Sequence, residues 1–159
     1  MEANTSGEPE LSRMFHAKDE PHSGLSAELE AICIPDLRVV SGKGEMELYR
    51  RDQADVPQML KDVLIQYAPD AVAQPSTPEA AVAVLEFAKA RGLPVVPRGS
   101  GSSPFGGSIP VNRGIVVDVG TMDRVLDVDV KNKLVKVQGG CRWADVDNAV
   151  SKHGLRLNT

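Results

Sequence analysis

Cysteine and histidine are scarce in this chain, with two cysteines and three histidines among 159 residues. Cys33 and Cys141 lie far apart, and His16, His22 and His153 do not cluster, so neither residue type has the spacing of a metal site. The same scarcity argues against a disulfide-stapled secreted domain. We therefore expect no bound metal and interpret both cysteines as buried thiols in a reducing compartment.

The chain also lacks long apolar stretches and clusters of basic residues. No apolar stretch approaches the roughly 20 residues of a membrane-spanning helix, and the polar first residues lack the apolar core of a signal peptide. The net charge is −4 and basic residues form no cluster, which disfavours nucleic acid as a partner. The remaining composition, 42% hydrophobic and 25% charged, is ordinary for a globular protein. We expect a cytoplasmic chain without a transmembrane segment.

The pattern along the chain predicts three parts. Residues 1–23 are polar, which is typical of a disordered tail. Residues 24–68 should form a helical and irregular N-terminal segment, in which residues 45–55 have the character of a polar surface. Residues 69–159 show a regular order of strands and helices. The expected strands are residues 39–40, 70–75, 93–96, 114–119, 125–129 and 134–138, and the expected helices are residues 25–32, 56–64, 78–91 and 143 to about 153.

The helix expected over residues 78–91 has signals at both ends. Thr77 can cap it with a proline at the first helical position, or Ser76 and Glu79 can form a capping box. Gly92 supplies a left-handed C-terminal cap, followed by Leu93 as its hydrophobic contact. The face expected to be buried consists of Ala81, Val84, Leu85 and Ala88.

The chain is organised around residues 97–110, which contain four glycines and four serines and are closed at both ends by proline. A long loop of this kind between two apolar strands usually carries function. Glycines allow a close backbone approach to a ligand, and successive free N–H groups form a concave anion site. This glycine loop therefore predicts a site for the pyrophosphate of a nucleotide cofactor.

Two familiar phosphate motifs do not fit the glycine loop. A Rossmann fingerprint, G-x-G-x-x-G, opens directly into a helix, whereas here Gly99 and Gly101 are followed by Pro104 at the sixth position and then by a strand. A P-loop requires lysine after its second glycine. Gly101 and Gly106 have the right spacing, but Gly107 stands at the lysine position. Both motifs are excluded.

The loop and its flanks together resemble one known family over roughly residues 25–159. Residues 97–103, with the later glycine pair and Pro110, look like the first FAD loop of the FAD-linked oxidases. This is the vanillyl-alcohol-oxidase-like superfamily with the PCMH-type FAD-binding domain. Within it, the chain resembles the N-terminal portion of the glycolate oxidase FAD-subunit and D-lactate dehydrogenase branch. The resemblance also rests on residues 74–79, 114–123 and 137–146, on Asp52 and on residues 67–70.

The resemblance implies an α+β fold, the N-terminal part of a PCMH-type FAD-binding domain, with a small mixed β-sheet flanked by helices over residues 69–159. It implies FAD as the cofactor, with the amides of residues 99–102 around its pyrophosphate and hydroxyls from Ser102 and Ser103. Because residues 97–110 contain no histidine, to which some members attach FAD, we expect non-covalent binding. The implied cofactor-binding residues are Pro97, Arg98, Gly99, Ser100, Gly101, Ser102, Ser103, Gly106 and Gly107.

Individual residues leave alternatives open. Arg98 can pair with a phosphate or brace the loop against a carboxylate. Pro97 and Pro110 fix the entry and exit of the loop. Trp143 invites a flavin-stacking role, but its position on the apolar face of a helix favours a core or capping aromatic.

The resemblance also implies an activity for the parent protein. It would be a flavin-dependent dehydrogenase or oxidase that acts on the CH–OH group of a small molecule, a 2-hydroxy acid such as glycolate or D-lactate, with hydride transfer to FAD. No catalytic residue can be named, the electron acceptor is unknown and a partner subunit stays open. We expect this chain to be an N-terminal fragment that is inactive alone. Two alternatives are an oxidase of another alcohol or amine, and an inactive FAD-binding or subunit-interaction module.

Overall fold

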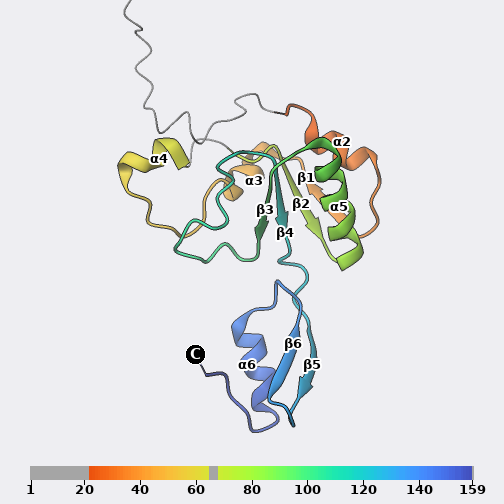
Figure 1. Cartoon of the computed structure of the whole chain (residues 1–159), viewed down its shortest axis with the longest axis vertical. Helices are drawn as coiled ribbons and strands as arrows, with labels where there is room; N and C mark the ends of the chain where they lie inside the picture. The colour runs from red at the N-terminus through yellow and green to blue at the C-terminus, as the bar shows by residue number, and fades with distance from the viewer. Residues whose placement is uncertain (1–21, 65–67, 159) are drawn as a thin grey trace, which may run out of the picture.

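The computed structural model describes residues 22–64 and 68–158, which form two lobes (Figure 1). The tail predicted over residues 1–23 lies almost entirely outside the described residues. The elements in chain order are α2 (Leu25–Ala31), β1 (Leu37–Val40), α3 (Lys43–Met46), the 3-10 helix η1 (Glu47–Tyr49), α4 (Gln58–Leu64), β2 (Ala71–Pro75), α5 (Pro78–Arg91), β3 (Val95–Arg98), β4 (Ile115–Asp118), β5 (Val125–Asp129), β6 (Leu134–Val137) and α6 (Trp143–Ser151).

Four strands of the first lobe form one mixed sheet in the order β1-β2-β4-β3. The strands β2, β4 and β3 are parallel, and β1 pairs antiparallel with β2. The register places Val116 of β4 opposite Val72 on one side and Val96 on the other. The small mixed sheet with flanking helices predicted from the sequence is therefore confirmed. Because β2 and β4 are inner strands, their residues are buried almost throughout.

Helices cover both faces of this sheet (Figure 1). On one face, α2 and α5 contribute Leu29, Val84 and Phe87 to a core that includes Ile115. On the other face, a second cluster is covered by Met46 of α3 and by the last residue of η1, and its buried members are Val40, Val72 and Val116. The glycine loop leaves the end of the edge strand β3 and returns to the start of the buried strand β4.

The ends of α5 follow one of the two predicted schemes. Thr77 caps the helix, since its side chain accepts a hydrogen bond from Ala80 N at 3.2 Å. The alternative capping box is wrong, because the Ser76 hydroxyl instead donates to the carbonyl oxygen of Asp36. Gly92 has a φ of 63° and forms the predicted left-handed cap.

Two burial predictions are wrong. The buried face of α5 is rotated from the expected one, with Phe87 inside and Leu85 49% exposed. The larger aromatic side chain fills the space over the sheet, next to Val84. The cysteines are not buried either, since Cys33 is exposed in the turn after α2 and Cys141 is half-buried.

The second lobe is the predicted β5–β6 hairpin with α6 packed beside it (Figure 1). Its junction with the first lobe requires glycine at residue 140, because a Cβ there would stand 2.9 Å from Gly120 Cα and overlap the carbonyl oxygen of Val119. The Gly140 N–H also donates to the carbonyl oxygen of Met122 at 2.9 Å. Close backbone contact therefore fixes the turn between β6 and α6 against the end of β4. No helix in the described residues is long and apolar enough to cross a membrane.

Candidate functional site

The glycine loop forms one wall of a cavity of about 440 Å³. Residues 99–103 and Ser108 line one side, and residues 139–143, in the turn from β6 into α6, line the other. These two segments are some forty positions apart in the sequence. Residues 99–103 of the first wall are predicted site residues, whereas Ser108 and the second wall are not, although residues 137–146 contribute to the family resemblance.

The backbone of this wall carries free hydrogen-bond donors. Within the described residues, the N–H groups of residues 99–103 donate to no backbone or side-chain acceptor. Gly101 has a φ of +65°, a left-handed conformation that glycine adopts without strain and that is typical of anion-binding turns. Such a group of amides suits a diphosphate, because several neutral donors can each bind one anionic oxygen. The donor set fits the pyrophosphate that the sequence predicts.

The structure divides the predicted site residues into two groups. Residues 99–103 lie together on the cavity wall, where the hydroxyls of Ser100 and Ser102 are 3.0 Å apart and hydrogen-bonded. Pro97 is an exposed residue of β3, and Gly106 and Gly107 belong to the outer turn of the loop, which reaches Ile109. These three residues do not line the cavity.

Of the two roles left open for Arg98 by the sequence, the structure contradicts the brace against a carboxylate. Its Nη1 donates to the carbonyl oxygen of Arg51 at 3.0 Å, so it braces the loop against the backbone rather than against a carboxylate. Its Cζ lies 5.2 Å from the centroid of the Tyr49 ring, in a cation–π contact. The guanidinium also fills the space beside Gly101, where a Cβ would stand 2.5 Å from Arg98 Cζ.

Residues 51–53 form a brace segment under the glycine loop. Besides the contact with Arg98, Gln53 N donates to the carbonyl oxygen of Gly101 at 3.2 Å. The carboxylate of Asp52 accepts from Ser108 N at 3.3 Å and from Ala54 N at 2.9 Å. The polar surface segment expected over residues 45–55 is therefore wrong in part, because this stretch holds both ends of the loop. Asp52, quoted for the family resemblance, was the one sequence signal of this role.

A second unpredicted feature is a buried carboxylate at the end of β4. Asp118 is 9% exposed, and its Oδ2 accepts from the Tyr49 hydroxyl at 2.8 Å and from Gln74 Nε2 at 2.9 Å. Gln74 Nε2 also donates to the Tyr49 oxygen at 2.9 Å. Burial first, and then the hydrogen bond to Asp118, raises the pKa of Tyr49 to about 12, so the phenol stays protonated. The only sequence signal for this hydrogen-bonded cluster is that polar residues stand near the ends of the strands.

Trp143 lies on the opposite wall of the cavity, and of its two predicted roles, core or capping aromatic, the core role is wrong. It opens α6 and is 73% exposed, whereas Val146 and Val150 are the buried residues of that helix. The neighbouring Arg142 pairs with Asp145 at 2.7 Å, and this pairing raises the pKa of the guanidinium. An aromatic ring and a cation therefore face the glycine loop across the cavity.

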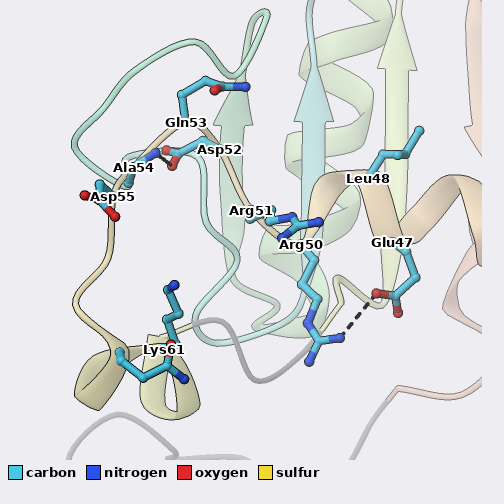
Figure 2. A pocket seen from close by; sticks show the side chains of 10 residues that line it. Glu47, Leu48, Arg50, Arg51, Asp52, Gln53, Ala54, Asp55 and Lys61 are labelled. Atoms are coloured by element: carbon cyan, nitrogen blue, oxygen red, sulfur yellow. Dashed lines mark hydrogen bonds and ion pairs between the residues drawn. The ribbon is translucent and has the colours of Figure 1, made fainter.

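A larger hollow of about 960 Å³ lies beside the brace segment (Figure 2). Figure 2 shows Arg50 paired with Glu47, at 3.3 Å, and Lys61 of α4 on another side of the hollow. Its lining balances three cations, Arg50, Arg51 and Lys61, against the carboxylates of Glu47, Asp52 and Asp55, so it carries no net positive charge that would attract an anion. In the described parts of the chain, no group of three or more histidine, cysteine or acidic residues could hold a metal.

Comparisons with known proteins identify the family of the chain. A family model described as FAD binding domain matches residues 69–159. The chain is 39% identical over 88 residues to an uncharacterized FAD-linked oxidoreductase of Mycobacterium tuberculosis, 36% over 84 residues to a D-lactate dehydrogenase of Archaeoglobus fulgidus, and 34% over 90 residues to the glycolate oxidase subunit GlcD of Bacillus subtilis. These matches cover 55%, 53% and 57% of this chain, but the chain spans only 19% of each relative.

A solved structure of an alkyldihydroxyacetonephosphate synthase shares the fold, with a TM-score of 0.67 at 22% identity, over 89% of this chain and 27% of that one. The predicted PCMH-type fold and the resemblance to the FAD-linked oxidases are thus confirmed. The family model covers more than half of the residues. The chain therefore belongs to the FAD binding domain family, and its cofactor is FAD.

Proposed function

We propose that the glycine loop binds the pyrophosphate of FAD through the amides of residues 99–102, with hydroxyls from Ser102 and Ser103. The observation that carries this proposal is the row of free N–H groups on the wall of the cavity. Arg98 supports the loop from behind, and Gly106 and Gly107 allow its tight return. Pro97 sets its entry. The absence of histidine from residues 97–110 supports non-covalent binding.

We further propose that the whole protein is a flavin-dependent oxidoreductase of a 2-hydroxy acid of the glycolate or D-lactate type. The names of two relatives, a D-lactate dehydrogenase and a glycolate oxidase subunit, support this substrate class. FAD supplies the acceptor for the hydride that leaves the α-carbon, while a base takes the hydroxyl proton. We assign no residue of this chain to that base.

The division into a tail over residues 1–23, an N-terminal segment over residues 24–68 and the FAD domain over residues 69–159 stays a prediction. So does a cytoplasmic location. A partner subunit stays open, and we name no electron acceptor. An oxidase of another alcohol or amine, and an inactive FAD-binding module, are the outcomes that the following experiment separates.

The test is to purify the full-length protein, record its absorption spectrum and titrate it with FAD. Bound flavin gives two visible bands. Glycolate, D-lactate, and unrelated alcohols and amines are then added without oxygen, and bleaching of the flavin reports its reduction. We expect bleaching by a 2-hydroxy acid. A folded protein that never binds FAD refutes the whole proposal, whereas bound flavin that only another alcohol or amine reduces refutes the substrate class.

A further inference from the structure

Four polar side chains stand in one row across the sheet, one from each strand. They are Arg38 of β1, Gln74 of β2, Asp118 of β4 and Arg98 of β3, and the strand register pairs Arg38 with Gln74 and Arg98 with Asp118. Gln74 links the row, because its amide oxygen accepts from Arg38 and its Nε2 donates to Asp118. The Tyr49 hydroxyl joins the row at Asp118, from the helical layer that covers this face.

Asp118 is tied to both walls of the proposed FAD cavity. Its Oδ1 accepts from Gly120 N at 2.9 Å, and Gly120 lies directly against Gly140, which belongs to the second wall. Its Oδ2 holds the hydroxyl of Tyr49, whose ring contacts Arg98. One buried carboxylate therefore fixes the relative placement of the two walls.

The path from Tyr49 to the glycine loop is short. The Tyr49 ring lies against the guanidinium of Arg98, and that guanidinium fills the space beside Gly101. Arg98 also ties the loop to the carbonyl oxygen of Arg51, two residues after Tyr49. A change in the position of the Tyr49 ring is thus passed to the turn that orients the free amides.

We propose that Tyr49 is a positioning residue for FAD, held by Asp118 and Gln74, that acts through Arg98 on the conformation of the glycine loop. This inference rests on the proposed binding of the FAD pyrophosphate by that loop. Packing alone does not require the hydroxyl, since the ring already contacts the apolar cluster on this face of the sheet. The hydrogen bond from the Tyr49 hydroxyl to Asp118 fixes the position of the ring on this apolar cluster.

The test is a double-mutant cycle on FAD affinity, measured by flavin fluorescence on the full-length protein. Tyr49→Phe keeps the ring and removes the bond to Asp118, and Arg98→Gln removes the charge beside Gly101. We expect each variant to raise the Kd for FAD about five- to tenfold. The double variant should be no weaker than Arg98→Gln alone, because Tyr49 acts through that side chain. Leu48→Ala, an exposed neighbour in η1, is the matched control and should bind as wild type does.

The outcomes separate this inference from the proposed function. If wild type binds FAD and Tyr49→Phe binds it equally well, with or without a lower melting temperature, the positioning role is refuted and the proposed function stands. Strictly additive effects in the cycle also refute it, because the two side chains would then act independently. If wild type itself binds no FAD, the proposed function fails and this inference fails with it.

Discussion

Replacing Gly101 with valine tests the proposed role of the glycine loop most directly. Gly101 has a φ of +65°, and a β-branched residue in this left-handed region costs about 1–2 kcal/mol. The new Cβ would also stand 2.5 Å from Arg98 Cζ, so the guanidinium must move. Movement would break its hydrogen bond to the carbonyl oxygen of Arg51, a charge-assisted bond of about 1.5–3 kcal/mol.

These two effects act on the loop and not on the core. Arg98 has a long, flexible side chain and can move aside, so we expect the fold to survive with only a modest loss of stability. Distortion of the loop by about 2.5–5 kcal/mol would weaken FAD binding by about 60-fold or more, because each 1.4 kcal/mol is a factor of ten. Binding would then be undetectable at ordinary cofactor concentrations.

The assay is a titration with FAD, followed by flavin fluorescence, alongside a thermal melt of each variant. Gly44→Val is the matched control, since Gly44 lies in α3 with a negative φ and nothing within 4 Å of a new Cβ. It should bind FAD as wild type does. A Gly101→Val protein that melts near the wild-type temperature and keeps wild-type affinity would show that the loop is not at the pyrophosphate.

Three further predictions concern the fold around the site. Gly140→Ala should lower the free energy of unfolding by about 3 kcal/mol or more, because the methyl group overlaps the rigid carbonyl of Val119; urea denaturation measures this, and an unchanged midpoint contradicts it. Tyr49 has its pKa raised from 10.0 to about 12, so its contribution to stability is complete below pH 10 and is lost between pH 10 and about 12. In that pH window the free energy of unfolding of the wild type should therefore fall more steeply than that of Tyr49→Phe. Parallel pH profiles of the two proteins would contradict this prediction. Thr77→Ala removes the hydrogen bond from Ala80 N and should lower the free energy of unfolding by about 1 kcal/mol in the same urea assay. An unchanged free energy of unfolding would show that this cap does not stabilise α5.

Much of the fold could be predicted because its signals are local. The cap at Thr77 and the left-handed glycine at residue 92 define α5 within a few residues of sequence. The β5–β6 hairpin follows from alternation on either side of a polar turn, where Lys133 has a φ of 56°. The buried face of α5 was misjudged, because periodicity does not say that Phe87 rather than Leu85 meets the sheet.

The sequence by itself determined where the glycine loop lies and which phosphate motifs it cannot be, since its glycine content, its proline boundaries and the apolar strands on either side are all local features of the sequence. Only the tertiary structure decided what surrounds that loop. Tyr49 and Asp118 are 69 positions apart, and their hydrogen bond exists because η1 covers the face of the sheet on which β4 ends. The exposure of Trp143 is likewise visible only in the folded chain, where Val146 and Val150 are the buried residues of α6. Local conformation is encoded in neighbouring residues, whereas a binding site is assembled from strand ends that only the packing of the sheet brings together.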